Sequence, residues 1–399
     1  MSMLKKLGLF GILLLLIVII FLKTRPPSVD NPLSSYPKCP GNLSGILTDQ
    51  LIELKNITSI TPLGNISPPG HTSPADHNYF TADTDEKIPV YAPADGWINN
   101  MVVILAKDEK SGKYVDRRIT LNIEICKGLT LTFANLTEAS SVLKDNWPKN
   151  DNGCKYDIVK DGHDYTEGQC YFHSNIKVKA GDLLGYTQNE NKKDGTKGFA
   201  FEIWAANYNK TPPSNIDWSF YDDERYAHIM CTFDLYSGSL KQQFYDKLGG
   251  VDQKNQTNLS FKPRKIEPIC GTVNQNTVGT IQGMWFGQDW KSRSDKTFVD
   301  NIRQFSFLHW NIDPSYAEIG NAGEITNGQP NQLYFIAKHS GTIDREPSEV
   351  KADGNIYCYN FLGGKVLAQL LDERHLKLEY QLDSCGTSEN FTKFYLYER

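Results

Sequence analysis

Several residues of this sequence could bind a metal ion: His71, Asp76, His77, His163 and His173. The first three share one loop rich in proline and glycine, and the last two flank Cys170. A catalytic zinc ion needs three protein ligands and a fourth position left open for water. A histidine in such a loop is more often solvated or hydrogen-bonded to the backbone. We therefore expect no metal and no other cofactor, and the residues that would contradict this are His71, Asp76, His77 and His173.

Three segments have the composition of strands and turns that could position such a site. Residues 89–98 read Pro-Val-Tyr-Ala-Pro-Ala-Asp-Gly-Trp-Ile, and residues 177–187 read Lys-Val-Lys-Ala-Gly-Asp-Leu-Leu-Gly-Tyr-Thr. Residues 197–204, Lys-Gly-Phe-Ala-Phe-Glu-Ile-Trp, form an apolar and aromatic strand. Together the three segments resemble the core of a lysostaphin-type (LytM-like) zinc endopeptidase domain. The resemblance covers residues 71–206.

The resemblance implies a zinc site from which most functional side chains are missing. In that family a His-x-x-x-Asp motif and the second histidine of His-x-His bind zinc, and two further histidines assist catalysis. Counted back from Val90 and matched along the motifs, these positions fall on His77, Thr81, Asn135, Gly198 and Ala200. Glycine and alanine offer no side-chain lone pair, and neutral threonine is a poor zinc ligand beside carboxylate and imidazole. The resemblance thus favours the fold without its activity, and we expect no catalytic residue.

The groove of such a domain would be lined here by aromatic and amide side chains. The candidate binding residues are Tyr79, Asn135, Gly198, Ala200 and Glu202. A β groove with aromatic platforms and amide donors suits a glycan or an extended peptide. Alternation along the strand places Phe199 and Phe201 on the face opposite Ala200 and Glu202, so these aromatic side chains could belong to the core instead. Glu202 could act as a catalytic acid, but the family pattern makes it structural.

The N-terminal residues 7–22 (LGLFGILLLLIVIIFL) are uncharged and almost wholly apolar. A bilayer core needs roughly 20 apolar residues, and the stems of flanking lysines can make up the difference. A cleaved signal peptide is the alternative, but the following Lys-Thr-Arg-Pro-Pro offers no small-residue cleavage site. We expect residues 1–25 to be a single-pass anchor in the cell membrane, with the bulk of the chain extracytoplasmic after a stalk at residues 26–40.

Cysteine usage and glycosylation sequons agree with export. The eight cysteines are scattered without a Cys-x-x-Cys motif, which is typical of disulfides in an oxidising compartment. Proximity in the sequence favours the pairs Cys154–Cys170, Cys358–Cys385 and Cys231–Cys270. Asn-x-Ser/Thr sequons are weak indications of glycosylation. The candidate sites are Asn42, Asn56, Asn135, Asn255, Asn258 and Asn390.

The strand patterns predict an all-β, mainly antiparallel chain of two domains. Residues 41–235 form the lysostaphin-like β domain. Residues 236–269 are expected to be a helix and a linker, because Leu240 and Phe244 have helical spacing and polar residues follow. Residues 270–399 contain short strands at close spacing, which is typical of a small antiparallel barrel or sandwich.

One short motif opens this second domain. Gly283-Met284-Trp285 resembles the Gly-x-Trp that opens lipocalin-like barrels. The resemblance implies an up-and-down barrel that could carry a small apolar ligand. Alternatively, Trp285 simply plugs one end of a barrel.

The net charge argues against one class of partner. A net charge of −5 gives no reason to expect nucleic acid as a partner. We predict a non-catalytic, peptidase-like module that binds a glycan, a peptide or a surface protein at the cell envelope. The first alternative is a zinc endopeptidase with displaced ligands that acts on cell-wall or surface peptides. The second is a carrier of a small apolar ligand within the C-terminal barrel.

Overall fold

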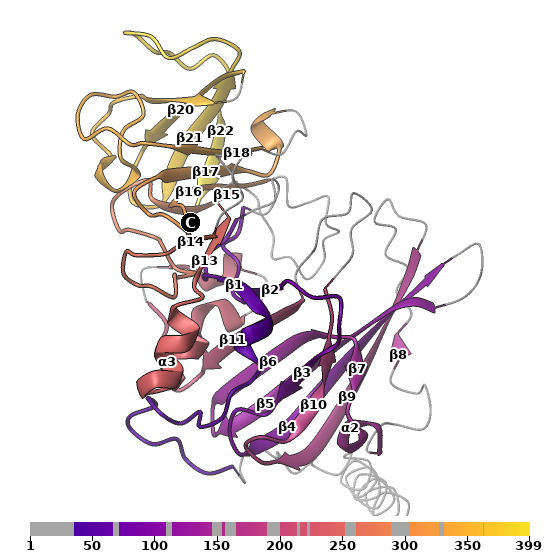
Figure 1. Ribbon diagram of the computed structural model, residues 1–399. Coiled ribbons are helices and arrows are strands. Elements are labelled where there is room, and N and C mark those ends of the chain that lie inside the picture. The colour runs from indigo at the N-terminus through magenta and orange to yellow at the C-terminus, as the bar shows by residue number, and fades with distance from the viewer. Residues whose placement is uncertain are drawn as a thin grey trace, which may run out of the picture. The chain divides into compact units, whose positions relative to one another are not determined.

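Strands dominate the computed structural model, and all paired strands in its described part run antiparallel (Figure 1). This confirms the mainly antiparallel β fold that the alternating sequence predicts. The chain from Cys39 to Arg399 forms one compact unit. The structure describes residues 36–66, 72–108, 114–145, 154–155, 165–189, 200–213, 216–221, 224–251, 261–288, 303–326, 331–361 and 363–399.

The first sheet has nine strands in the order β1-β2-β11-β6-β5-β4-β9-β8, with β12 beside β11. Long alternating runs form its centre, where β4 pairs with both β5 and β9. The strands are β1 (Ile57–Thr61), β2 (Asn78–Ala82), β4 (Gly96–Asp108), β5 (Tyr114–Cys126), β6 (Leu129–Leu136), β8 (Cys154–Lys155), β9 (Tyr165–Val178), β11 (Phe201–Asn207) and β12 (Ile229–Met230).

A smaller sheet contains the other two segments that carry the resemblance. It has the order β3-β10-β7, with bounds Ile88–Tyr91, Leu183–Thr187 and Glu138–Ala139. The turns after β3 and before β10 dock on each other, because Asp95 Oδ1 accepts a hydrogen bond from the Ala180 amide at 3.0 Å. At the far end of β10, the Thr187 hydroxyl donates to the carbonyls of Asn135 and Ala200. These bonds bring residues 89–98, 177–187 and the described part of 197–204 together.

The core of the first sheet follows from the alternation in β11. Phe201 and Ile203 are fully buried, as the alternation predicts for the packing face. The Phe201 ring lies 5.2 Å from that of Phe80 on β2, and the Phe80 ring lies 6.0 Å from that of Phe233. Aromatic pairs at these distances add to the stability from burial alone. The packing of its inner face thus holds β11 in the sheet, and this packing does not depend on the side chains of its outer face.

The helix expected within residues 236–269 packs on this core. The helix α3 spans Gly238–Tyr245, and its Phe244 stacks on Phe233 and Tyr236 at 4.9 and 4.8 Å. Leu248, just after the helix, is also fully buried. A hairpin of β13 (Gly249–Val251) and β14 (Phe261–Pro263) follows. The shorter helices of the first domain are η2 (Leu54–Asn56), α2 (Ser141–Asp145), η3 (Trp218–Phe220), η4 (Glu224–Ala227) and η5 (Thr232–Leu235).

The C-terminal sheet has eight strands and is close to a closed barrel (Figure 1). Apart from β18 and β19, which form its two edges, consecutive strands are neighbours in it, and the last strand, β22, pairs back with the first, β15. The chain that connects the edge strands β18 and β19 forms two isolated β-bridges, one between Lys338 and Arg345 and one between Ile343 and Cys358. The strands are β15 (Gly283–Gly287), β16 (Gln304–His309), β17 (Ala317–Asn321), β18 (Asn331–Phe335), β19 (Tyr357–Phe361), β20 (Gly364–Leu370), β21 (His375–Gln381) and β22 (Tyr395–Glu398), with η8 (Glu324–Thr326) and η9 (Pro347–Glu349) between them.

Aromatic side chains pack the interior of this barrel. Phe305, Phe307, Tyr359 and Tyr397 belong to one buried cluster with Trp285. The Trp285 indole donates to the Ile281 carbonyl at 2.8 Å, and the Arg399 guanidinium lies 4.4 Å from the centre of its ring. Arg399 also donates to the carbonyls of Thr277, Thr280 and Gln282. Trp285 is therefore held in the buried cluster by its bond to Ile281 and by the contact with Arg399.

Disulfide bonds join segments that are distant in the sequence. Cys231 is bonded to Cys270 and Cys358 to Cys385, which confirms two of the predicted pairs. For the third, Cys170 is disulfide-bonded, and β8 places Cys154 directly opposite it in the sheet. The remaining bond, between Cys39 and Cys126, spans 87 residues of sequence, so proximity along the chain gave no indication of it.

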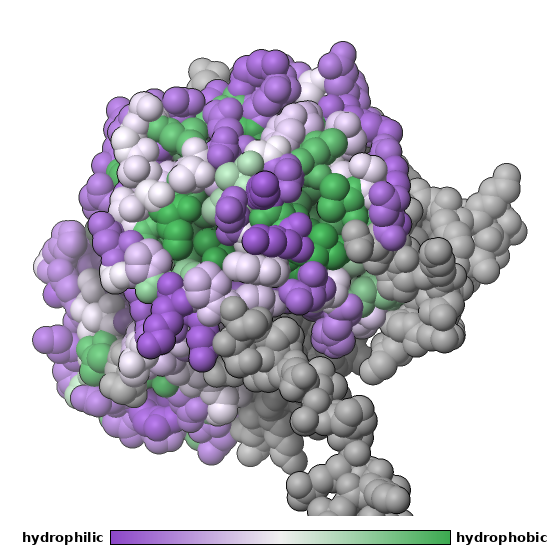
Figure 2. Space-filling view, turned by 90° about the horizontal axis from the view of Figure 1, so that it is seen from below, coloured by the Kyte–Doolittle hydropathy of each residue, from purple (hydrophilic) through white to green (hydrophobic). Residues whose placement is uncertain are grey.

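The expected anchor, residues 7–22, lies outside the described residues. Within those residues, no helix is long and apolar enough to cross a membrane. Figure 2 shows apolar areas separated by hydrophilic residues on one face. That face therefore presents a mixed surface and not one continuous apolar patch.

Candidate functional site

The outer face of β2 and β11 carries Tyr79 and Glu202, two of the binding residues that the sequence singled out. The register pairs Glu202 on β11 with Tyr79 on β2. Successive side chains of a strand alternate between faces, so Trp204 shares this face with Glu202. His77 immediately precedes β2, and its ring lies 4.5 Å from that of Tyr79 and 5.5 Å from that of Trp204. We refer to Asp76, His77, Tyr79, Glu202, Trp204 and Arg225 as the His77 cluster.

An ion pair lies at the buried side of the His77 cluster. Asp76 Oδ1 is 2.6 Å from His77 Nδ1, and Asp76 Oδ2 is 2.8 Å from Arg225 Nε. The Arg225 guanidinium also lies over the Trp204 ring at 4.8 Å, a favourable cation–π distance. Burial alone would raise the pKa of Asp76, but the hydrogen bond with His77 and the charge of Arg225 outweigh it, so this pKa lies below its ordinary value. Asp76 is therefore ionised at neutral pH and fixes the orientation of His77.

The opposite side of His77 faces a second carboxyl group. Glu202 Oε2 lies 3.7 Å from His77 Nε2, and each side chain is 20% exposed. Burial raises the pKa of Glu202, and the charge of His77 and a hydrogen bond with Asn135 offset this only in part. Asn135 adopts a left-handed backbone with φ of 65°, which asparagine tolerates better than most residues. An imidazole beside two carboxyl groups offers hydrogen-bonding atoms to which a polar ligand can bind.

The positions that the resemblance assigned to zinc do not converge. Ala200 lies beside β2, where its amide donates to the Phe80 carbonyl at 2.9 Å. Ala200 is fully buried, so its side chain is not available to a ligand. Thr81 stands near this end of β2 and His77 just before the other, and four extended residues span roughly 13 Å. Gly198 lies outside the described residues. The counted positions of His77 and Thr81 are therefore too far apart to share one ion.

The other metal candidates do not join His77 either. His173 is exposed on β9, and four strands separate β9 from β2, which amounts to about 24 Å at the usual strand spacing. His71 and His163 lie outside the described residues. His77 and Glu202 supply two ligands, whereas a zinc ion in a protein needs three or four.

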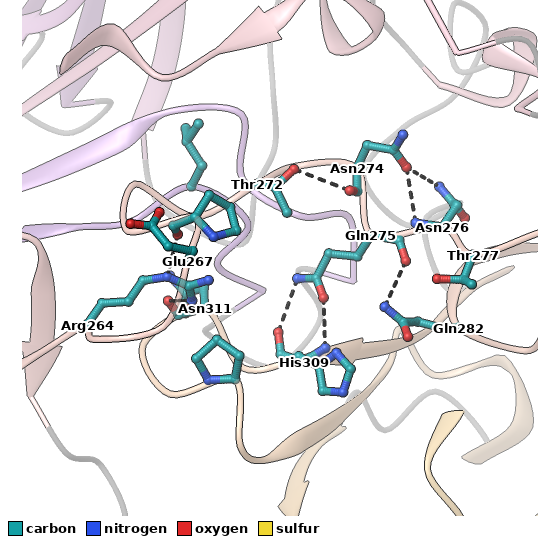
Figure 3. A pocket seen from close by; sticks show the side chains of 13 residues that line it. Arg264, Glu267, Thr272, Asn274, Gln275, Asn276, Thr277, Gln282, His309 and Asn311 are labelled. Atoms are coloured by element: carbon teal, nitrogen blue, oxygen red, sulfur yellow. Dashed lines mark hydrogen bonds between the residues drawn. The ribbon is translucent and has the colours of Figure 1, made fainter. Parts of the chain in front are cut away.

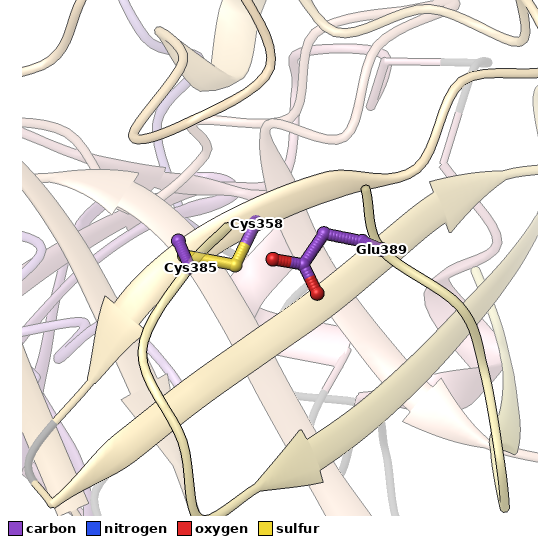
Figure 4. A group of neighbouring side chains, drawn as sticks. All are labelled: Cys358, Cys385 and Glu389. Carbon is purple, nitrogen blue, oxygen red and sulfur yellow. A yellow bond between two sulfur atoms is a disulfide. The ribbon is translucent and has the colours of Figure 1, made fainter. Parts of the chain in front are cut away.

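Among the described residues, one group of three has its potential ligand atoms within 4.8 Å of one another: Cys358, Cys385 and Glu389 (Figure 4). The two cysteines are bonded to each other at 2.01 Å. Zinc is bound by the thiolate form of cysteine, which a disulfide does not supply. Glu389 is instead paired with Lys365. This group is therefore structural.

Sequence reasoning missed Arg225, which completes the His77 cluster. It lies in the short helix η4, directly after Glu224. No motif connects it with Asp76, because the two residues meet only through the fold. The nearest signal is the aromatic composition of the segment Arg225-Tyr-Ala-His, which indicates partial burial.

The glycosylation candidates differ in accessibility. Asn42 and Asn390 are exposed, whereas Asn56 and Asn135 are half-buried. Asn255 and Asn258 lie outside the described residues. Because the Asn135 side chain is bonded to Glu202, a glycan there would disrupt the His77 cluster. Asn42 and Asn390 are therefore the most accessible acceptors among those that the structure describes.

Comparisons with family models, curated proteins and solved structures found no match.

Proposed function

We propose that this chain is a membrane-anchored, extracytoplasmic binding protein whose first β domain recognises a ligand without cleaving it. The observation that supports this proposal most directly is which groups surround the His77 ring. Its two ring nitrogens face carboxyl groups of Asp76 and Glu202 at 2.6 and 3.7 Å. A carboxylate behind a histidine is common at zinc sites, but only Glu202 stands beside it as a second ligand in the described part of the chain.

The His77 cluster has the chemistry of a recognition surface. Tyr79 and Trp204 provide aromatic rings, while His77 and Glu202 provide a donor and an acceptor side by side. Such combinations fix the orientation of a sugar or an extended peptide by a few polar contacts on an apolar support. The likeness of residues 71–206 to a peptidase domain agrees with a peptide or glycan of the cell envelope as ligand.

The proposed location rests on two features. Residues 7–22 have the length and flanks of a membrane anchor. The disulfides of the described part suit an oxidising compartment. Together they support an exported chain held at the membrane.

Metal content tests this proposal against the zinc endopeptidase alternative. The purified full-length protein is analysed for zinc by mass spectrometry, beside His77→Ala and the control His339→Ala, whose histidine is 76% exposed in the C-terminal domain. We expect substoichiometric zinc in all three and no cleavage of cross-linked cell-wall peptides. One zinc per chain that is lost only in His77→Ala would overturn the proposal.

Ligand recognition is tested on arrays of envelope glycans and peptides. Glu202→Gln keeps the size of the side chain but removes its charge, and we expect it to weaken binding by roughly tenfold, as loss of a hydrogen bond to a charged group does. Glu373→Gln, at an exposed position after β20, is the matched control. Equal binding by both variants would exclude the His77 cluster as the recognition surface.

A further inference from the structure

A polar cavity of about 280 Å³ lies apart from the His77 cluster, beside the end of the barrel where β15 begins and β16 ends (Figure 3). Its lining comes from three segments: residues 264–268 after β14, residues 272–282 before β15, and residues 309–314 after β16. Leu63 and two prolines supply apolar walls. The volume lies just below the range of about 300–1,000 Å³ that is typical of drug-sized ligands, so the cavity suits a smaller molecule.

A buried cation lines one side of this cavity. Arg264 is 7% exposed, and its Nε and Nη1 donate to the carbonyls of Pro268 and Asn311 at 2.8 and 2.6 Å. Burial lowers the pKa of Arg264 to about 10, although Glu267 and Asp313 act in the opposite direction. No residue of the described chain accepts a hydrogen bond from its Nη2 or forms a salt bridge with it. The guanidinium is thus hydrogen-bonded to carbonyls and has no carboxylate in direct contact among the described residues, and a bound anion would offset the cost of its burial.

The amide groups around Arg264 are held in place by other bonds. The Gln275 side chain accepts from the His309 amide at 2.8 Å and donates to the His309 carbonyl at 3.1 Å. The Gln282 side chain donates to the Gln275 carbonyl at 3.0 Å, which leaves Gln282 Oε1 as an acceptor. Asn311 donates to the Pro62 carbonyl at 2.8 Å, and its Oδ1 is buried without a partner among the described residues. Groups fixed in this way bind a ligand without a further cost of ordering them.

We infer that this cavity binds an acidic sugar, with the sugar carboxylate on Arg264 and a sugar hydroxyl on Gln282 Oε1. A planar guanidinium matches a carboxylate in a two-pronged geometry, and a hydroxyl supplies the donor that the amide oxygen needs. Glu267 is the one carboxylate among the described lining residues. It repels a second negative charge, so the ligand carries a single carboxylate.

Calorimetry on the purified full-length protein tests this inference with four probes. Glucuronic acid and N-acetylneuraminic acid each have one carboxylate and several hydroxyls, glucose has hydroxyls alone, and acetate has the carboxylate alone. We expect at least one acidic sugar to bind, and glucose and acetate to bind at least tenfold more weakly. Glucose binding as tightly as the acids, or no binding of either acid, would overturn the inference.

Two variants with opposite expected signs sharpen the test. Glu267→Gln removes the repelling charge from an exposed residue, so acidic-sugar binding should tighten, by roughly threefold to tenfold at low salt. Arg264→Met should weaken it by tenfold or more. If Arg264→Met fails to fold by circular dichroism, the Glu267→Gln result decides alone, and unchanged or weaker binding in that variant contradicts the inference.

Two further comparisons complete the test. The first distinguishes the end of a glycan from a free sugar, and the second distinguishes this cavity from the His77 cluster. The methyl glycoside of the bound acid should bind as well as the free acid if the ligand is the end of a surface glycan, and should fail if it is a free sugar. His77→Ala should leave binding unchanged, because His77 is not among the residues that line this cavity. Loss of binding in that variant would contradict a separate site.

Discussion

Glu346 provides the most quantitative test of the structure, because its carboxylate is strongly stabilised in the folded state. It accepts hydrogen bonds from Ser348 Oγ at 2.9 Å and from the Ser348 amide at 3.2 Å, and it lies 3.0 Å from His309 Nε2. Burial alone would raise the pKa of Glu346, but these contacts lower it from 4.5 to about 2. A lowering of that size corresponds to roughly 3 kcal/mol of stability at neutral pH.

The sign of the pH dependence follows from the direction of this pKa shift. The contribution of the Glu346 carboxylate is present above pH 4.5 and disappears as the pH falls towards about 2. Linkage predicts that roughly half of it remains at pH 3. Glu346→Gln should therefore be less stable than the natural chain by about 3 kcal/mol at pH 6.5, and by about 1.5 kcal/mol at pH 3.

Urea unfolding followed by circular dichroism at pH 6.5, 4 and 3 measures this difference. Glu53→Gln is the matched control, because Glu53 precedes the short helix η2 as Glu346 precedes η9, makes no capping bond with its side chain, and is 41% exposed in its pair with Lys55. Exposed pairs contribute about 0–1 kcal/mol, so the control should lose little at any pH. The reasoning is refuted if Glu346→Gln loses no more than the control at pH 6.5, or if its deficit is the same at pH 3.

Three other substitutions test the packing of the two domains, each by urea unfolding. Phe201→Ala should cost about 3–5 kcal/mol, because it empties a fully buried site, and a loss below 1 kcal/mol would contradict the assigned inner face of β11. Arg399→Ala should cost about 2–3 kcal/mol through its lost carbonyl bonds, and Arg399→Lys should recover only part because lysine lacks the planar fork. Replacing Cys231 and Cys270 by serine should cost about 4 kcal/mol, since the bond closes a loop of 39 residues; an unchanged midpoint would refute this.

The sequence predicts those parts of the fold that depend on local patterns. Alternation identifies Phe201 and Ile203 as the buried face of β11, because the side-chain period of a strand is two. Short strands at close spacing indicate the C-terminal barrel for the same reason. The pair Cys231–Cys270 follows from proximity along the chain. Each of these inferences needs only neighbouring residues.

Contacts between distant segments are beyond such patterns. The position of α3 in the first core depends on Phe244 stacking with Phe233 and Tyr236, whereas the sequence shows only the amphipathic spacing of the helix. The contact between Arg399 and Trp285 joins the first and last strands of the barrel. Neither contact can be predicted from neighbouring residues, because the side chains involved are of types that are common on helices and strands.

The candidate site shows why counting positions along a motif is less reliable than alternation. Counting assumes that the chain between two positions folds as it does in the family that supplies the motif. Here β2 is extended from Asn78 to Ala82, so His77 and Thr81 lie at its two ends and not around one ion. Alternation required no such assumption, and it placed Glu202 on the face opposite Phe201, where His77 also lies. The face of a strand is thus determined by its residues, whereas the site on that face is determined by partners such as Arg225 that arrive from elsewhere in the chain.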